Sequence, residues 1–440
     1  MQPAARLQAV IEILNEIESG IQWLSVPADV AVASYTRSRR YIGSKDRRAI
    51  IDLVYAIVRQ RGRHIWRLTE TGLSLTGRNL AISHSALNEP NLASYFGADI
   101  PHAPSALTKT EQSAAQMMPK NLEGAPLFAT HEVPYPLAEG FRERFGSKFD
   151  EAMAALNGTA PLDIRSNPIK PKKNLSRGLR ELEENIEKTV FSPIGYRLAS
   201  KLNLNGNPLF REGYVEVQDE AAQLACYLVD LDSDMSVMDL CAGAGGKTLL
   251  LSALMKNKGQ IFAFDTSANR LKKAKPRIDR AGCRNIQTKV LPREADARKS
   301  ILSGFIGKVN RVVVDVPCSG SGTLRRNPDQ RWRMSGMGLE NLRMEQSSLL
   351  EEASRMVKPG GRIVYMTCSV LPQENERVVE YFLEQAGSDW FAVDYKDVWR
   401  RVLPGTPPET ASSNPSCLQL VPHMHQTDGF FVAILERRLS

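Results

Sequence analysis

The 440-residue sequence has few cysteines and no long apolar run, and each shortage excludes a class of protein. Six cysteines are too few for the disulfide framework of a small secreted protein. No two of them form a Cys-x-x-Cys pair, which argues against a bound metal. No stretch approaches the roughly 20 apolar residues needed to cross a bilayer. The start of the chain carries acids in a helical pattern and no secretory signal, so we expect a cytoplasmic protein that uses no membrane.

Length and positive charge are what the chain has in excess. A chain of 440 residues exceeds one ordinary core, which predicts two or three domains. Its 57 lysines and arginines outnumber 49 acids and give a net charge of +8. Such a balance favours a polyanionic partner such as nucleic acid, although many basic proteins bind none.

Hydrophobic periodicity divides the first half of the chain into three stretches. Residues 1–83 repeat apolar positions at helical spacing and carry flanking arginines that could meet phosphates, which predicts an all-α domain. Residues 84–140 are rich in proline and small polar residues, which predicts a loosely structured connector or insertion. Residues 141–215 combine short helices, a strand and a basic turn, which predicts a small α+β domain. Contact with an RNA backbone and a solvated loop explain that turn equally well.

Residues 216–440 alternate strands and helices, which predicts a mostly parallel, doubly wound α/β sheet. Ligands of such sheets bind at the carboxyl ends of the strands. Two β-rich segments, VVVDVPCSGSGT (residues 312–323) and RIVYMTCSV (residues 362–370), place Cys-Ser at such ends. Cys318 and Cys368 are therefore expected at the ligand edge. The other four cysteines are better explained as buried apolar residues.

A glycine-rich turn, DLCAGAGGKT (residues 239–248), follows a predicted strand and begins a helix. Its glycines allow the backbone to approach a ligand at the helix start. Asp265, at the end of the next strand, can accept both hydroxyls of a ribose, and Asp296 follows the third strand. NAD, FAD, S-adenosylmethionine and a tight turn without ligand all remain open at this point. Asp239, just before the turn, disfavours a pyrophosphate and suits the cationic methionine end of S-adenosylmethionine.

Two cysteines at strand ends suggest a specific chemistry. Carbon 5 of cytosine is a poor nucleophile, but a thiolate that adds to carbon 6 makes it enamine-like, so that it attacks an electrophilic methyl group. Cysteine suits this step because its thiolate forms readily in an electropositive pocket. Asp315, three residues before Cys318, is placed to keep the ring nitrogen protonated during the addition.

The ordered segments DLCAGAGGKT, DVPCSGSGT, RNPDQRW, KPGGRIVYMTCSVLPQENE and TDGFFVAILER resemble the motifs of the Sun/RsmB-like RNA cytosine-5 methyltransferases. The segment VQDEAAQL also resembles that family, and the likeness spans about residues 140–440. The helical start is similar, more loosely, to a NusB-like RNA-binding domain. The resemblance implies a class I, Rossmann-like methyltransferase sheet with a C-terminal antiparallel strand, S-adenosylmethionine as cofactor, and ribosomal RNA as substrate.

The resemblance also implies roles for individual residues. Cys368 corresponds to the nucleophile and Cys318 to the cysteine that assists product release, while Asp315 stabilises the cytosine and Lys247 lies near the reacting groups. The cofactor would be held by Cys241, Ala242, Gly243, Ala244, Gly245, Gly246, Lys247, Asp265, Arg270, Asp296 and Asp315. The family commonly reads Ala-Ala-Pro-Gly-Gly where this turn reads Ala-Gly-Ala-Gly-Gly, and residues 84–140 have no clear counterpart.

Two other functions are compatible with this sequence. A DNA cytosine-5 methyltransferase would use Cys318 as the attacking thiol, but no target-recognition region lies between the motifs. A non-catalytic RNA-binding or ribosome-assembly factor would have lost a cysteine or Asp315, and all three are present. For the RNA enzyme we expect a monomer acting on a single-stranded or loop cytidine, because the base must be unstacked to reach a strand end.

Overall fold

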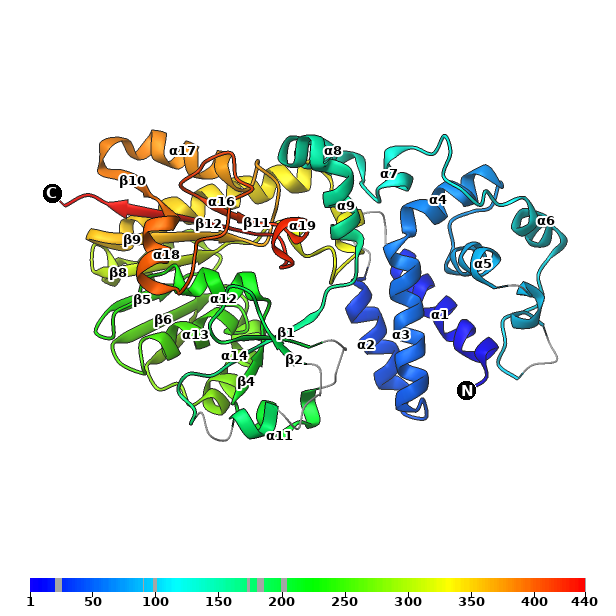
Figure 1. Ribbon diagram of the computed structural model, residues 1–440, viewed down its shortest axis with the longest axis horizontal. Coiled ribbons are helices and arrows are strands. Elements are labelled where there is room, and N and C mark those ends of the chain that lie inside the picture. The colour runs from blue at the N-terminus through cyan, green and yellow to red at the C-terminus, as the bar shows by residue number, and fades with distance from the viewer. Residues whose placement is uncertain are drawn as a thin grey trace. The chain divides into compact units, whose positions relative to one another are not determined.

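The computed structural model describes residues 1–19, 26–89, 91–97, 101–171, 175–179, 186–198 and 204–439. The chain forms two compact units (Figure 1). We call Met1–Gly158 with Thr323–Gly338 the helical unit, and Thr159–Gly322 with Leu339–Ser440 the sheet unit. Within the described ranges, no helix has the length and apolar character needed to span a bilayer.

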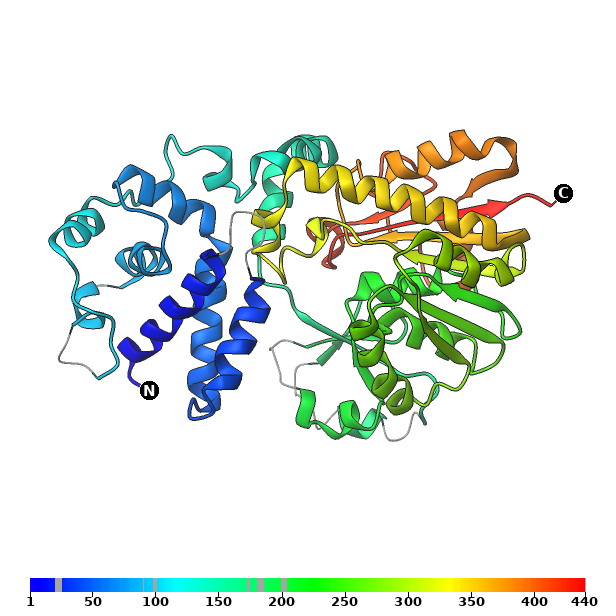
Figure 2. The same cartoon turned by 180° about the vertical axis from the view of Figure 1, so that it is seen from behind.

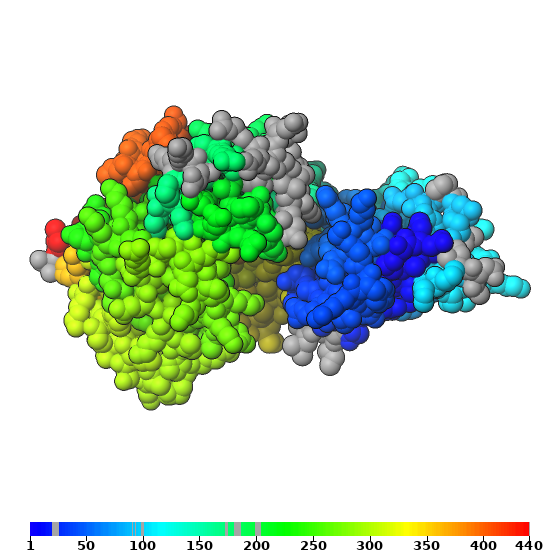
Figure 3. Space-filling view, turned by 90° about the horizontal axis from the view of Figure 1, so that it is seen from below, coloured from blue at the N-terminus to red at the C-terminus, as the bar shows by residue number. Residues whose placement is uncertain are grey.

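The helical unit is built from amphipathic helices around one apolar core. They are α1 (Pro3–Glu18), α2 (Ala28–Ser38), α3 (Ser44–Arg59), α4 (Arg61–Glu70), α5 (Gly77–Asn88), α6 (Lys109–Met117), α7 (Leu127–Thr130), α8 (Tyr135–Phe145) and α9 (Phe149–Asn157). Val10 and Leu14 of α1 are fully buried against Ile50, Val54 and Ile57 of α3, as the helical spacing of the apolar residues predicts. The expected all-α start is therefore confirmed. Figure 3 shows in blue the surface that the first helices present.

The stretch at 84–140 differs from the expected loose connector. Its described part contains α6, α7 and the start of α8, and Ala114 and Met118 are buried there. Thr108 and Glu111 form a reciprocal capping box that begins α6. Pro126 and Pro134 are the N-cap residues of α7 and α8. Proline is tolerated at a helix start, so these prolines begin helices here instead of marking a connector.

The boundary between the connector and the small α+β domain, expected at 140/141, does not separate the two compact units, which divide after Gly158. α8 and α9 belong to the helical unit, which runs to Gly158. The helical unit also includes Thr323–Gly338, the segment that follows the Cys318 turn. Arg331 of that segment is fully buried and donates from Nη1 to the carbonyl oxygen of Glu132 at 2.8 Å. Asp329 accepts a hydrogen bond from the backbone N–H of Ala28 at the start of α2.

A small antiparallel sheet begins the sheet unit. Its order is β2 (Ile186–Lys188), β3 (Gly195–Leu198), β1 (Leu162–Ser166), β4 (Val215–Val217). The strand expected near residue 162 is thus present, and the basic turn after it lies partly outside the described residues. Glu216 of β4 pairs with Arg277 of α14 (Ala268–Ala281) at 3.0 Å. Arg277 also donates to the carbonyl oxygen of Ala244 at 2.7 Å, so the small sheet helps to support the glycine turn.

The main sheet confirms the predicted fold class. Its order is β10 (Trp390–Val393), β12 (Phe430–Arg437), β9 (Val357–Thr367), β8 (Val309–Asp315), β5 (Ser236–Asp239), β6 (Gln260–Asp265), β7 (Ile286–Val290), and β11 (Leu418–Leu420) pairs with β12. The five strands from β7 to β9 are parallel, and β12 is antiparallel to β9. This is the mostly parallel sheet with an antiparallel C-terminal strand that the sequence predicts.

Helices cover both faces of this sheet (Figures 1 and 2). α12 (Glu220–Tyr227), α13 (Gly246–Leu254) and α18 (Tyr395–Val402) supply buried residues to one face. α15 (Ala295–Leu302), α16 (Gly336–Met356) and α17 (Glu376–Ala386) supply them to the other. Successive residues of β8 alternate between the two cores, with Val313 in one and Val312 and Val314 in the other. A strand buried on both faces explains the continuous Val-Val-Val run.

Candidate functional site

The two Cys-Ser steps meet at the carboxyl end of the sheet. β8 and β9 are parallel neighbours, and Asp315 at the end of β8 pairs with Met366 of β9. The chain then turns at both ends, and Sγ of Cys318 lies 3.3 Å from Sγ of Cys368. Both thiols are half-buried and line one cavity. The structure therefore brings together the two cysteines that the sequence places at separate strand ends.

The Cys318 thiol is held in its protonated form. The hydrogen bond to Cys368 and burial hold the pKa of the Cys318 thiol well above its usual range. A protonated Cys318 can donate a hydrogen bond to the sulfur of Cys368.

A buried carboxylate, Glu374, connects the two Cys-Ser turns. It accepts hydrogen bonds from the backbone N–H of Ser319 at 2.8 Å and from the hydroxyl groups of Ser319 and Ser369, each at 2.5 Å. Gln346 of α16 donates to it at 3.0 Å. Glu374 is fully buried, so these charge-assisted bonds fix both turns in one arrangement. Sequence reasoning missed this role, because Glu374 lies 55 residues from Ser319 and looks like an ordinary acid before a helix.

Lys247 joins the glycine turn to the end of β8. Its Nζ donates to Oδ2 of Asp315 at 2.6 Å and lies 5.0 Å from the centre of the Phe430 ring. Burial acts to lower the pKa of Lys247, but the charge and hydrogen bond of Asp315 outweigh it and raise the pKa to about 12. Lys247 therefore stays charged and also interacts electrostatically with Cys368.

The cavity beside the thiols has a volume of about 740 Å³. The predicted site residues that line it are Cys241, Gly243, Ala244, Asp265, Arg270, Asp315, Cys318 and Cys368. It also contains cations that sequence reasoning did not single out, namely Lys273, Arg293 and Arg298. The cavity thus joins the glycine turn, the end of β6 and the two thiols at one edge of the sheet.

The donor set of this cavity fits S-adenosylmethionine. Gly243 has a φ of 57°, and a Cβ placed there would meet only the carbonyl oxygen of Cys241 at 4.0 Å. The turn therefore leaves space for a ligand to approach its backbone. Asp265 accepts hydrogen bonds from the backbone N–H groups of Gly243 at 2.8 Å and Ser267 at 2.7 Å. A carboxylate has about four lone-pair sites, so capacity for ribose hydroxyls remains.

Several predicted cofactor residues lie away from the cavity lining. Ala242 donates its backbone N–H to Phe264, and Gly245 is the N-cap of α13 with a φ of 81°. Gly246 begins α13, so these residues shape the turn. Asp296 is exposed in the first turn of α15 and is not among the described side chains that line the cavity. Its contact with the cofactor stays a prediction.

Asp239 lies beneath the turn instead of facing the cavity. Its side chain is buried and accepts a hydrogen bond from the Thr248 hydroxyl at 2.7 Å. Burial raises the pKa of Asp239 to about 7, and the nearby charge of Asp315 adds to this effect. Asp239 is not among the described residues that line the cavity, so its predicted interaction with the methionine end of the cofactor stays a prediction.

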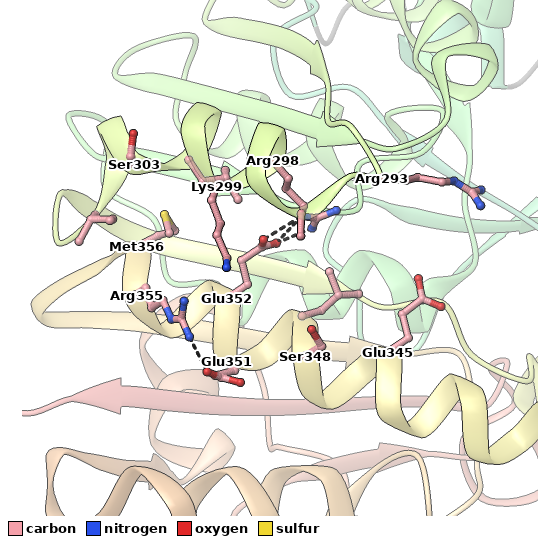
Figure 4. Close-up of a pocket in the computed structure, with 14 residues that line it drawn as sticks. Arg293, Arg298, Lys299, Ser303, Glu345, Ser348, Glu351, Glu352, Arg355 and Met356 are labelled. Carbon is pink, nitrogen blue, oxygen red and sulfur yellow. Dashed lines mark hydrogen bonds and ion pairs between the residues drawn. The ribbon is translucent and has the colours of Figure 1, made fainter.

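A second pocket of about 570 Å³ adjoins the first (Figure 4). Arg293, Arg298 and Glu345 line both pockets. Figure 4 shows Arg298 of α15 and Glu352 of α16 pointing toward one another, and their carboxylate–guanidinium pair bridges the two helices. This ion pair joins α15 to α16 beside both pockets.

Comparisons with known proteins show the family to which this chain is similar. The model of the 16S rRNA methyltransferase RsmB/F family matches residues 226–436. A probable ribosomal RNA small subunit methyltransferase B from Synechocystis sp. (strain PCC 6803) is 35% identical over 312 residues, covering 70% of this chain and 67% of that protein. The ribosomal RNA small subunit methyltransferase B of Shewanella oneidensis is 25% identical over 98% of both chains. The crystal structure of PH0851 superposes with a TM-score of 0.78 and 25% identity over 99% of both chains.

Proposed function

Because this chain belongs to the RsmB/F family of 16S rRNA methyltransferases, we propose that it methylates carbon 5 of a cytosine in ribosomal RNA. The observation that carries the proposal is the 3.3 Å separation of Sγ of Cys318 and Sγ of Cys368, beside Asp315 and a nucleoside-sized cavity. S-adenosylmethionine, the cofactor of the family, supplies a methyl group made electrophilic by its positively charged sulfur.

The first step is the addition of a thiolate to the base. The thiolate of Cys368 forms a bond to carbon 6 of cytosine. The electrons of the 5–6 double bond shift toward ring nitrogen 3, which takes up a proton from water. Lys247 holds Oδ2 of Asp315, and among the described residues no donor bonds to the second oxygen of that carboxylate. That oxygen is free to hold the ring nitrogen and amino group of the cytosine. Carbon 5 becomes nucleophilic as a result.

Release reverses the addition after the methyl group is in place. A base takes the proton from carbon 5, the electron pair of that bond restores the 5–6 double bond, and the bond between Sγ of Cys368 and carbon 6 breaks. Cys318 donates a hydrogen bond to the departing sulfur, which leaves as a thiolate. Cys368 thus attacks the base and Cys318 assists release of the product, while Glu374 holds both turns in position.

A denaturing gel tests this division of roles. The wild type, Cys318→Ala and Cys368→Ala are incubated with 16S rRNA and S-adenosylmethionine, and the gel reports any protein–RNA adduct that survives denaturant. We expect Cys318→Ala to accumulate the adduct and Cys368→Ala to form none. The reverse pattern would assign the attack to Cys318, as in a DNA cytosine-5 methyltransferase. No adduct and no methyl transfer from any variant would support a non-catalytic RNA-binding factor.

A further inference from the structure

The helical unit contains a cationic pocket that the methyl-transfer chemistry does not use. It has a volume of about 500 Å³ and lies between α4, the C-terminal end of α5 and the segment after α6. Its polar lining is formed by Gln60, Arg63, Arg67, Asn88 and Lys120, and its other lining residues are apolar. Three cations and two amides thus face one concave space, and none of the described residues that line it is a carboxylate.

Arg67 is held in a fixed orientation in this pocket. The residue is only 6% exposed, and its Nε donates to the carbonyl oxygen of Pro119 at 3.0 Å. Within the described ranges Arg67 forms no ion pair. Burial, and next the like charge of Arg63, lower the pKa of its guanidinium, and the charge of Glu132 acts in the opposite direction. A buried cation beside another cation is costly unless an anion offsets the charge.

The positive charge of Arg67 is not offset by its neighbours Arg63 and Lys120, because both are cations as well. Arg63 lies one helical turn before Arg67, so both side chains share a face of α4. Arg63 pairs with Glu132 at 3.6 Å and donates to the carbonyl oxygens of Ala129 and Thr130. That carboxylate also accepts the backbone N–H groups of Gly62 and Arg63. Burial raises the pKa of Glu132 to about 7, so it is only partly ionised at neutral pH. Lys120 is exposed, and no carboxylate pairs with it in the described part of the chain.

We propose that this pocket binds a phosphate group of the RNA backbone. The inference rests on the proposed function for the identity of the anion, because ribosomal RNA is the polyanion that such an enzyme must hold. Guanidinium forks bind phosphate oxygens in a fixed geometry, lysine adds a mobile charge, and the two amides add neutral donors. Phosphate contacts of this kind position a nucleic acid without reading its sequence. The pocket would therefore hold the substrate through its backbone.

A structural role for the same cations makes a different prediction. The carbonyl groups at the C-terminal end of α5 carry partial negative charge, which nearby cations stabilise. If that were the whole role of the cations, removing one would lower the melting temperature and leave RNA affinity unchanged. Affinity and stability must therefore be measured on the same variants.

The experiment measures binding of a 16S rRNA transcript to the full chain without S-adenosylmethionine, at several salt concentrations. The variants are Lys120→Gln, which changes an exposed side chain, and Arg67→Gln, which changes a buried one. Arg142→Gln, an exposed arginine of α8 outside the pocket, is the matched control. We expect each pocket variant to weaken binding about tenfold, and the slope of log affinity against log salt to become less steep by about 0.7 to 0.9 for each RNA phosphate that the variant no longer neutralises.

Three outcomes would overturn the proposal. One is that Lys120→Gln and Arg67→Gln match Arg142→Gln in affinity and salt slope. Another is that the wild type does not bind the transcript. A third is that inorganic phosphate raises the melting temperature of the wild type, but not of Arg67→Gln, while RNA affinity is unaffected, which would mark a site for free phosphate. Because binding is measured without turnover, loss of RNA affinity in the variants would support the pocket even if no cytosine is methylated.

Discussion

Nζ of Lys247 lies 2.6 Å from Oδ2 of Asp315, and this ion pair connects the glycine turn with the strand that leads to Cys318. The pair stands beside the thiols, because the charge of Lys247 also acts on Cys368. The ion pair therefore links the cofactor turn, the carboxylate that would hold the cytosine and the attacking sulfur. We therefore expect a substitution of Lys247 to slow the addition of the thiol to the base.

We expect Lys247→Gln to slow adduct formation by one to two orders of magnitude. The variant removes the positive charge that pairs with Asp315 and acts on Cys368. The measurement is the rate of adduct formation in a Cys318→Ala background. Lys272→Gln, which changes an exposed lysine of α14, is the control and should leave the rate unchanged. A rate for Lys247→Gln equal to that of the control would show that Lys247 does not act on the nucleophile.

Glu374→Gln should disturb the chemistry more than the binding of the cofactor. A neutral amide loses the charge that strengthens the bonds from Ser319 and Ser369, and its N–H₂ group presents donors where acceptors are needed. We expect kcat to fall at least tenfold, with a nearly unchanged Kd for S-adenosylmethionine measured by calorimetry. Glu384→Gln, an exposed acid of α17, is the matched control. Equal kcat for the two variants would exclude Glu374 as a positioning residue.

The parts of this molecule that sequence patterns predict are those determined by local structure. The runs that became β8 and β9, and the turn from Asp239 to Thr248, each need only neighbouring residues to be recognised. The ligand edge then follows from the rule that parallel strands end on one side. The predicted group of Cys318, Cys368, Asp315 and Lys247 is assembled in this way.

The features that escaped prediction depend on contacts between distant residues. Arg331 follows the Cys318 turn in the chain, but packs with Glu132 in the helical unit. Glu374 gains its role only when folding brings Ser319 to it. The prolines of 84–140 looked like breakers because composition does not show that Pro126 and Pro134 occupy helix N-caps. For Arg331 and Glu374 the tertiary partner determines the role of the residue, whereas for the two prolines the position in the helix determines it.

Asp239 should make the stability of the protein depend on pH. Burial raises its pKa from 3.8 in the unfolded chain to about 7 in the folded chain, so the folded state retains a proton between these values. Its stabilising contribution is complete below pH 4 and is lost as pH rises through 7. Asp239→Asn cannot ionise and preserves an acceptor for Thr248. We expect the free energy of unfolding of the wild type, relative to this variant, to fall by about 4 kcal/mol at most between pH 4 and 8.

Urea unfolding of both proteins across this pH range measures the difference. Other titrating groups, including Glu132, are common to the two proteins, so their contributions cancel in the comparison. Parallel curves for the wild type and Asp239→Asn would mean that Asp239 has similar pKa values in the folded and unfolded states.

Gly243→Ala tests whether the glycine turn holds the cofactor. Gly243 and Gly282 both have a positive φ, 57° and 77°, and neither has an atom nearer than 4.0 Å to an added Cβ. Both alanine variants should therefore lose about 1 kcal/mol of stability from backbone strain. Only Gly243 lines the cavity, whereas Gly282 is the C-cap of α14. We expect Gly243→Ala alone to weaken S-adenosylmethionine binding at least tenfold by calorimetry, because its methyl group enters the space of the ligand. Equal affinities for the two variants would place the cofactor away from this turn.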